Sequence, residues 1–163
     1  MTVDRNNIEE YFSRYRDNVF AVAFNFFKNP CEADDCVQET FIKLLKCDVN
    51  FESEEHIRNW IIRVAINECK RVTLSSWFRK KESIEDYAEK LSFTDPEESS
   101  LFYAVMSLPS KYRQVVHLYY YEDYSVKEIA EILGRSETAI TTQLSRARKI
   151  LKSTLSEAWV TAR

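Results

Sequence analysis

The sequence predicts an all-α protein of two small helical domains that are joined by an acidic linker. Its 163 residues include one glycine and three prolines, which are too few turn-forming residues for the many tight connections of a sheet protein. Apolar residues recur instead at steps of three and four, the spacing of amphipathic helices. The acidic segment 82–97 loses this spacing and divides the chain into domains at residues 1–81 and 98–163.

The first domain is expected to begin with one long helix, followed by a second helix that Asn29 caps. The first helix has a single apolar stripe, made of Ile8, Phe12, Tyr15, Val19, Val22 and Phe26. Pro30 suits the first turn of the second helix, and the acidic residues after it suit the positive end of the helix dipole. The apolar side chains that this helix turns inward are Val37, Phe41 and Leu44. The polar ones on its outward face are Asp35, Gln38, Glu39 and Lys43.

A third helix, capped by Ser53, is predicted to have two different faces. The side chains spaced for burial are Ile57, Trp60, Ile61 and Val64. The other side has a polar stripe of Asn59, Arg63, Asn67 and Lys70, followed by Arg71 and the cluster Arg79, Lys80 and Lys81. Cations interleaved with aromatic rings, here Trp60, Trp77 and Phe78, are typical of single-stranded nucleic-acid binding. A solvated face above an ordinary core explains the stripe equally well, with Trp60 as part of that core.

The second domain is predicted to contain four helices, the last two in a helix-turn-helix. The inward residues of the first two helices are Leu101, Phe102, Val105 and Met106, then Tyr112, Val115, Val116 and Tyr119. Ser125 and Glu128 have the spacing of a capping box, and the short helix that they begin should stop at Gly134. Ser136 is expected to cap the last helix. The apolar stripe of that helix is Ile140, Leu144, Ala147 and Leu151.

The outward face of the last helix is rich in hydroxyl and basic groups. Its members are Thr141, Thr142, Ser145, Arg146, Arg148, Lys149 and Lys152, with Gln143 beside them. A helix fits the major groove of DNA, where hydroxyl and amide groups bond base edges and cations attract phosphates. The pattern therefore favours a DNA-binding helix, although a helical hairpin with a solvated basic face has the same spacing.

The charge of the chain is small overall and strongly segregated. The net charge is −3, yet residues 70–81 carry 5 basic and no acidic side chains, and residues 135–163 carry 6 basic and 2 acidic ones. Because the general field repels phosphate while only these patches attract it, we expect weak binding to free duplex DNA. The sequence therefore predicts a partner that holds the protein on DNA.

The sequence offers no pattern for catalysis, a metal or another cofactor. No CxxC pair occurs among Cys31, Cys36, Cys47 and Cys69, and the two histidines stand alone, which argues against a metal site. Paired carboxylates at usable spacing, a nucleophile with a base and a glycine-rich phosphate loop are missing, so we do not expect an enzyme. No apolar run reaches the length of a signal peptide or a membrane helix. We expect a cytoplasmic protein with reduced, mostly buried thiols and no membrane insertion.

Three segments resemble the sigma factors of bacterial RNA polymerase, of the small extracytoplasmic-function (ECF) group that keeps only sigma regions 2 and 4. EADDCVQETFIKLL at 32–45 and HIRNWIIRVAINECKR at 56–71 are similar to region 2. LPSKYRQVVHLYYYEDYSVKEIAEILGRSETAITTQLSRARKIL at 108–151 is similar to region 4, and SRAR at 145–148 is its most specific part. The resemblance spans nearly the whole chain.

The resemblance implies a promoter-specificity subunit without catalytic activity. Region 2 would bind the clamp helices of the largest core polymerase subunit through Asp35, Gln38, Glu39 and Phe41. It would face the minus-10 element with Asn59, Trp60, Arg63, Asn67, Lys70 and Arg71, and the loop from Cys47 to Glu55 would receive a flipped base. Region 4 would bind the flap of the second-largest subunit and face the minus-35 element with Thr138, Thr141, Thr142, Gln143, Arg146 and Arg148. An anti-sigma factor is a further implied partner.

The last helix departs from the family pattern. The family commonly has lysine or arginine where this chain has Thr141 and Gln143, and a glycine-threonine pair where it has Thr138 and Ala139. Fewer cations mean less attraction to phosphate and a different base preference. The minus-35 sequence therefore cannot be borrowed from relatives.

The alternative interpretation is a self-sufficient helix-turn-helix regulator. Its first domain would sense a signal or form a dimer, and its second domain would bind DNA. A palindromic footprint in the absence of polymerase, or a dimer in solution, would favour this alternative.

Overall fold

The structure, a computed structural model, describes residues 1–75 and 96–161, and in these ranges the chain forms helices and connections without strands. The prediction of an all-α fold is confirmed. The chain divides into two compact units, Met1–Glu82 and Ser83–Arg163. The predicted cluster Arg79, Lys80 and Lys81, the aromatic residues Trp77 and Phe78, and nearly all of the predicted linker 82–97 lie outside the described residues.

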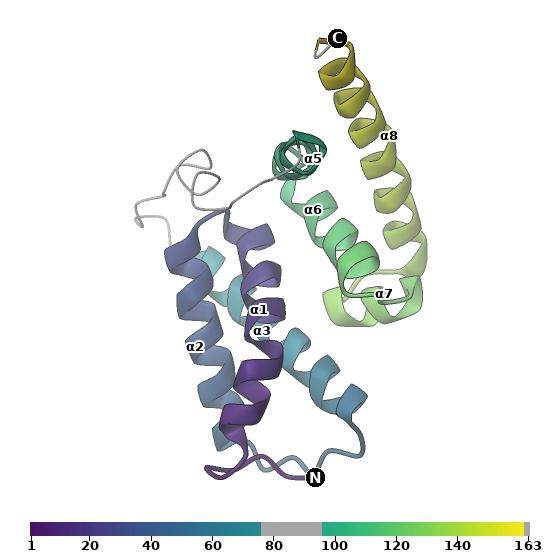
Figure 1. Ribbon diagram of the computed structural model, residues 1–163. Coiled ribbons are helices and arrows are strands. Elements are labelled where there is room, and N and C mark those ends of the chain that lie inside the picture. The colour runs from purple at the N-terminus through teal and green to yellow at the C-terminus, as the bar shows by residue number, and fades with distance from the viewer. Residues whose placement is uncertain (76–95, 162–163) are drawn as a thin grey trace. The chain divides into compact units, whose positions relative to one another are not determined.

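The first unit is a bundle of three helices, each in contact with the other two (Figure 1). They are α1 (Ile8–Phe27), α2 (Pro30–Lys46) and α3 (Glu54–Ser75). Side chains with no exposed surface fill the space between them, namely Val19, Ala23, Ala33, Leu44, Ile57, Ile61, Ile62, Ala65 and Cys69. Removal of this apolar surface from water is the main force that holds the bundle together.

Several residues of the apolar stripes predicted in the first unit are less buried than expected, Ile8 and Phe26 among them. Phe12 is 36% exposed, and the edge of its ring meets Phe41 with the ring centroids 5.0 Å apart. Trp60 and Val64 are half-buried. Because α3 packs against both α1 and α2, its buried face is wider than one stripe and includes Ile62, Ala65, Ile66 and Cys69.

The two helix starts predicted in the first unit are confirmed by their hydrogen bonds. The Oδ1 of Asn29 accepts from the backbone N–H groups of Cys31 and Glu32, at 2.9 and 3.2 Å, and Pro30 occupies the first turn of α2. The Oγ of Ser53 accepts from the N–H of His56 at 3.0 Å. Such caps satisfy backbone donors that have no partner within the helix.

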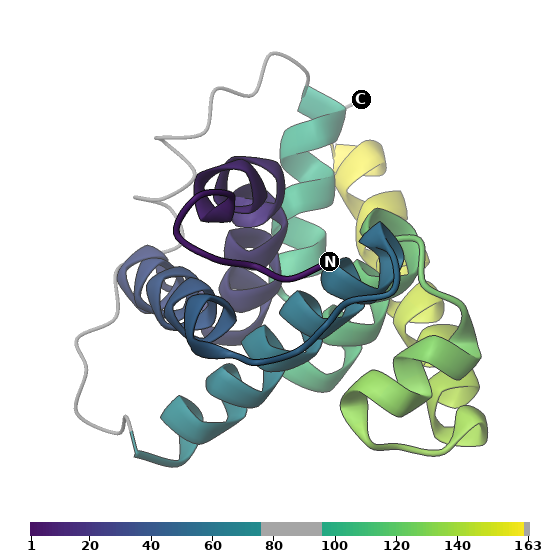
Figure 2. The ribbon, with the colours of Figure 1, turned by 90° about the horizontal axis from the view of Figure 1, so that it is seen from below.

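The second unit contains the four predicted helical segments, and α8 is in contact with each of the other three helices. They are α5 (Pro96–Met106), α6 (Ser110–Val116) continued by the π-helical turn η1 (His117–Tyr121), α7 (Val126–Leu133) and α8 (Glu137–Thr161). Leu108, Tyr112, Val116 and Ala147 form one core cluster, and Leu151 packs against it. In Figure 2, α7 and the first turns of α8 lie side by side.

The π-helical turn is a feature that the spacing of apolar residues did not predict. The N–H of Glu122 donates to the carbonyl oxygen of His117 at 3.1 Å, a bond that spans one residue more than an α-helical bond. The ring of His117 stacks on Tyr121, with the centroids 5.4 Å apart. The wider turn changes the direction in which the three consecutive tyrosines at 119–121 point.

The helix-turn-helix connection has the geometry that the sequence predicts. Ser125 Oγ accepts from the N–H of Glu128 and Glu128 Oε1 accepts from the N–H of Ser125, both at 3.1 Å, which completes the capping box. Gly134 ends α7 with φ 68° and ψ 41°. Its N–H and that of Arg135 both donate to the carbonyl oxygen of Ala130. The Oγ of Ser136 accepts from the N–H of Ala139 at 3.1 Å and caps α8.

Replacement of Gly134 by alanine is expected to destabilise the second unit by about 1 kcal/mol, the cost of placing an L side chain in the left-handed region. An added Cβ would meet no atom within 4 Å, so backbone strain is the whole effect. Urea unfolding of the full chain measures it. Gly134→Asn is the matched control and should lose less, because asparagine tolerates this conformation. Equal losses in both variants would contradict the prediction.

Candidate nucleic-acid interface

The outward face of α8 is the first candidate DNA-binding surface. Its opposite face is buried as predicted, with Ile140, Leu144 and Ala147 at most 2% exposed. Of the residues predicted to face the minus-35 element, Thr142 and Gln143 are half-buried, and the exposed ones are Thr138, Thr141, Arg146 and Arg148. All six lie on one helix but not on one face. Arg146 and Arg148 lie on opposite flanks, because residues two positions apart on a helix point away from each other.

Arg148 is held by tyrosine side chains of the π-helical turn. Its Nε donates to the hydroxyl oxygen of Tyr120 at 2.6 Å, and its guanidinium lies 5.6 and 5.7 Å from the ring centroids of Tyr119 and Tyr120. The hydrogen bond to Tyr120 raises the pKa of Arg148. Helical spacing does not predict this pairing, although the three consecutive tyrosines at 119–121 are a visible signal in the sequence. Arg148 can contact DNA only with its remaining N–H groups or by leaving the tyrosines.

Gln143 is held by Arg135, a residue that the sequence analysis did not single out. The Nη1 of Arg135 donates to Gln143 Oε1 at 3.0 Å, and its Nη2 donates to Gln114 Oε1 at 3.4 Å. Arg135 is half-buried, and burial lowers the pKa of its guanidinium, which still remains charged at neutral pH. A basic residue directly after the turn glycine was the only signal in the sequence.

The polar side of α3 is the second candidate surface. Arg63 and Asn67 are exposed, and Asn59, Trp60 and Lys70 are half-buried. The Oδ1 atom of Asn59 is buried and has no hydrogen-bond partner in the part of the chain that the structure describes. Trp60 meets the ring of Phe51 edge-on, with the centroids 5.8 Å apart. The structure thus brings these five predicted residues together along α3, and it also ties Trp60 to the connection before that helix.

Arg71, predicted to face the minus-10 element, is engaged with a carboxylate. Its guanidinium pairs with Glu68, whose side chain is 1% exposed, and Lys43 of α2 pairs with the other oxygen of Glu68 at 2.7 Å. The hydrogen bond from Arg71, with that from Lys43, holds the pKa of Glu68 below its usual value in spite of burial. Arg71 lies beside Asp35 and Glu39 of α2, and its side chain is 63% exposed while it pairs with Glu68.

The outward side of α2 meets Arg71 in a small hollow. Asp35, Gln38 and Glu39, three of the residues predicted to bind core polymerase, are exposed and line a cavity of about 220 Å³ together with Arg71. The fourth, Phe41, is only 5% exposed and does not line this cavity. Its ring packs against Phe12, so Phe41 supports the surface from below rather than forming part of it.

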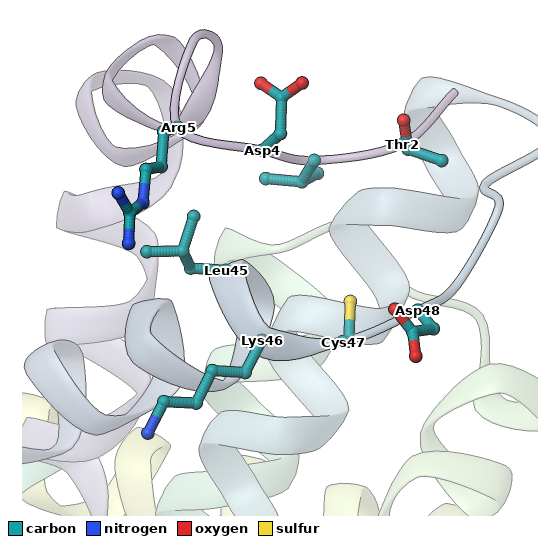
Figure 3. Close-up of a pocket in the computed structure, with 8 residues that line it drawn as sticks. Thr2, Asp4, Arg5, Leu45, Lys46, Cys47 and Asp48 are labelled. Carbon is teal, nitrogen blue, oxygen red and sulfur yellow. The ribbon is translucent and has the colours of Figure 1, made fainter.

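The connection between α2 and α3, predicted to receive a flipped base, is held by the N-terminal residues. The N–H of Phe51 donates to the carbonyl oxygen of Met1 at 2.6 Å, and the amine of Met1 donates to Asn50 Oδ1 at 2.7 Å. A cavity of about 490 Å³ lies between residues 2–5 and residues 45–48. Figure 3 shows Leu45 and Cys47 pointing toward the N-terminal segment. The connection therefore follows a course fixed by contacts nearly fifty residues away in sequence.

All four cysteines lie in the described part of the first unit. Cys36 and Cys69 are buried, with their Sγ atoms 3.6 Å apart, while Cys31 is exposed and Cys47 is half-buried. The expectation of mostly buried thiols thus holds for two of the four. Residues 1–75 and 96–161 contain no group of three or more potential metal ligands. No helix in the same ranges is long and apolar enough to cross a membrane.

Two comparisons with solved structures agree with this fold. The structure of CnrH in complex with the cytosolic domain of CnrY has a TM-score of 0.63 and 23% sequence identity, and the match covers 94% of this chain and 90% of that one. The sigma factor RpoE from Bartonella quintana, solved in complex with the anti-sigma factor NepR, has a TM-score of 0.63 and 18% identity, with 92% and 97% covered.

Sequence comparisons identify the family. Residues 11–83 match the family model "Sigma-70 region 2", and residues 100–151 match "Sigma-70, region 4". RNA polymerase sigma factor SigV of Bacillus subtilis (strain 168) is 26% identical over 150 residues, which cover 88% of this chain and 87% of SigV. The ECF sigma factor SigM of the same organism is 28% identical over 161 residues, with 90% and 93% covered. These matches show that the chain belongs to the sigma-70 family, as an RNA polymerase sigma factor of the ECF group.

Proposed function

We propose that α8 contacts the minus-35 element and α3 the minus-10 element of a promoter, while core RNA polymerase holds the two units on DNA. The observation that carries this proposal is the outward face of α8, where hydroxyl and basic groups are exposed above a fully buried apolar stripe. In this assignment residues 1–81 form region 2, residues 98–163 form region 4 and residues 82–97 form the linker between them.

In region 4, we do not expect the proposed minus-35 residues to contribute equally to DNA binding. They are Thr138, Thr141, Thr142, Gln143, Arg146 and Arg148. Arg146 is exposed, and no hydrogen bond or ion pair holds it to another side chain in the described part of the chain. Arg148 and Gln143 are each held by a neighbouring side chain. Arg146 is therefore the residue we expect to contribute most directly to DNA binding.

Arg146→Ala is expected to weaken binding to the minus-35 element. If the guanidinium reads a base, the loss should be about 1 to 3 kcal/mol and should depend on that base. If the guanidinium holds a phosphate, the loss should be nearly the same for all minus-35 sequences. Transcription from minus-35 variants, assayed side by side with reconstituted holoenzyme, distinguishes the two. Lys111→Ala serves as the control. This substitution also removes one positive charge, but Lys111 lies on α6, against the ring of Tyr112. An equal loss in both variants would assign the effect to net charge alone.

In region 2, the exposed residues Arg63 and Asn67 are proposed to contact the minus-10 element, together with Asn59, Trp60 and Lys70. A melted strand needs flipped bases captured and its phosphates held by cations. Arg71, whose side chain is 63% exposed while it pairs with Glu68, is proposed to hold a phosphate beside them.

The partners and the compartment are part of the same proposal. Asp35, Gln38 and Glu39 are proposed to bind the clamp helices of the largest polymerase subunit, with Phe41 fixing α2 beneath them, and region 4 is proposed to bind the flap of the second-largest subunit. Because RpoE was solved with an anti-sigma factor, we propose that this chain also has one. Work with RNA polymerase implies a cytoplasmic protein.

The test is promoter binding and run-off transcription with and without purified bacterial core polymerase. We expect weak, unspecific binding by the free protein, because its net charge is −3, and specific initiation once core is added. A genomic library as template would yield the promoter sequence. Equal affinity for DNA with and without core would contradict the proposal.

A further inference from the structure

The side-chain amide of Gln143 is fixed in one orientation by a chain of hydrogen bonds. Ser110 Oγ accepts from Gln114 Nε2 at 3.0 Å, and the Oε1 of Gln114 accepts from Arg135 Nη2 at 3.4 Å. The Nη1 of Arg135 donates to Gln143 Oε1 at 3.0 Å. A guanidinium has only donors, so each glutamine that it contacts turns its oxygen toward it. The orientation of both amides follows from this chemistry.

The position of Arg135 is set by the turn between α7 and α8. Gly134 in the left-handed region allows the N–H of Arg135 to donate to Ala130 at 3.0 Å, which fixes the backbone of the turn. Gln114 is 7% exposed, so it holds the other side of the guanidinium in a buried position. Arg135 is therefore anchored by the turn and by α6 before it meets α8.

Gln143 keeps its NH2 group for another partner. The structure gives its Nε2 atom no partner among the described residues, and this atom is not among their buried unsatisfied atoms. Gln143 lies three residues before Arg146, so the two side chains are neighbours on the same flank of α8. A ligand that approaches this flank meets the two N–H groups of Gln143, while the amide oxygen is turned toward Arg135.

We infer that Arg135 is a positioning residue that makes Gln143 present its NH2 group to the base, so that guanine is preferred over adenine at one position of the minus-35 element. An unrestrained glutamine pairs with adenine through both its oxygen and its NH2 group. Because the oxygen is turned toward Arg135, the NH2 group is the part of the amide left to face a base. Guanine offers this group two neighbouring acceptors, O6 and N7, in the major groove. This inference rests on the proposed contact of α8 with the minus-35 element.

The experiment uses holoenzyme reconstituted from the full chain and core polymerase, on a promoter library with a randomised minus-35 element, with transcripts sequenced. For the wild type we expect one position at which guanine, on one strand, is preferred over adenine about tenfold, the scale of one good base contact. Gln143→Ala should flatten that position only. A preference for adenine or thymine at that position would overturn the inference, and so would a profile without any base preference that Gln143→Ala leaves unchanged.

The variant Arg135→Ala tests the role of the guanidinium. Freeing the Gln143 oxygen should move the preference from guanine to adenine with the purine on the same strand, whereas Lys111→Ala, which also removes one charge from the unit, should leave the base unchanged. The double variant Arg135→Ala/Gln143→Ala should match Gln143→Ala. A guanine preference that survives Arg135→Ala would overturn the inference. Should that variant not fold, the wild-type profile alone still decides.

The same library separates the inference from the proposed function. If no minus-35 position affects transcription and Arg146→Ala has no effect, the assignment of α8 to this element fails. If minus-35 preferences exist and depend on Arg146 but not on Gln143, the assignment stands and only the inference fails.

Discussion

Replacing Glu68 with alanine is expected to destabilise the first unit by about 2 to 3 kcal/mol. Glu68 is 1% exposed and pairs with Lys43 of α2 and with Arg71 one turn later on α3, so its loss removes two charge-assisted hydrogen bonds and leaves a cavity between helices. The loss should stay below that of a fully buried pair, because both cations remain half-exposed to water. Urea unfolding of the full chain, followed by circular dichroism, measures the effect.

Glu54→Ala is the matched control for this change. Glu54 also accepts from an arginine, Arg14, at 2.7 Å, but its side chain is 52% exposed, and surface ion pairs contribute little. The first unit of this variant should therefore unfold at nearly the wild-type urea concentration. Similar losses for Glu54→Ala and Glu68→Ala would show that burial of Glu68 does not matter.

The effect of Glu68 should also depend on pH in a definite direction. Because Arg71 and Lys43 lower the pKa of Glu68 in the folded protein, its contribution is fully present above the unfolded value of about 4.3 and is lost as the pH falls through the folded pKa. The stability gap between wild type and Glu68→Gln should be constant near neutral pH and shrink below about pH 4.3. A gap that widens in acid would contradict the assignment.

Trp60→Ala is expected to damage promoter opening more than closed-complex binding. Trp60 is half-buried on the polar side of α3, where its exposed part can stack on a base, and such stacking is worth about 1 to 3 kcal/mol. Permanganate reactivity of the melted strand should therefore fall by roughly tenfold, while retention of promoter DNA by the closed holoenzyme stays close to the wild-type level.

The control for this change is Trp60→Phe, which keeps an aromatic face and the edge-on contact with Phe51, whose centroid is 5.8 Å away. It should retain most of the opening activity. Since Trp60 also packs against Phe51, the urea midpoints of both variants are needed beside the promoter data. Unchanged permanganate reactivity in Trp60→Ala would defeat the role in opening and leave Trp60 as a packing residue.

Local chemistry explains what could be predicted along the chain. The cap at Asn29, the capping box of Ser125 and Glu128, and the left-handed Gly134 each involve residues at most four positions apart. The buried stripe of α8 follows from helical spacing in the same way. Even the exposed part of the candidate site, such as Arg63 and Arg146, could be predicted, because polar side chains away from an apolar stripe remain in water.

The predictions that were incomplete concern side chains that meet across helices. Glu68 lies within a segment that the sequence analysis treated as a cationic stripe, yet it pairs with Lys43 and Arg71 and turns Arg71 toward α2. Phe41 was predicted both to turn inward and to bind core polymerase, and in the structure it is buried with its ring against Phe12 of α1. The π-helical turn brings Tyr120 to Arg148 across 28 residues, a distance over which helical spacing carries no information.

The sequence by itself determined the helices, their ends and the two basic faces, because capping and periodicity act within one or two turns. Only the tertiary structure decided which polar groups are free to bind DNA. Arg148 and Gln143 look equivalent to Arg146 along the chain, but Tyr120 and Arg135 hold them. Their partners come from other helices and from the turn, and which donor reaches which acceptor depends on how those elements pack.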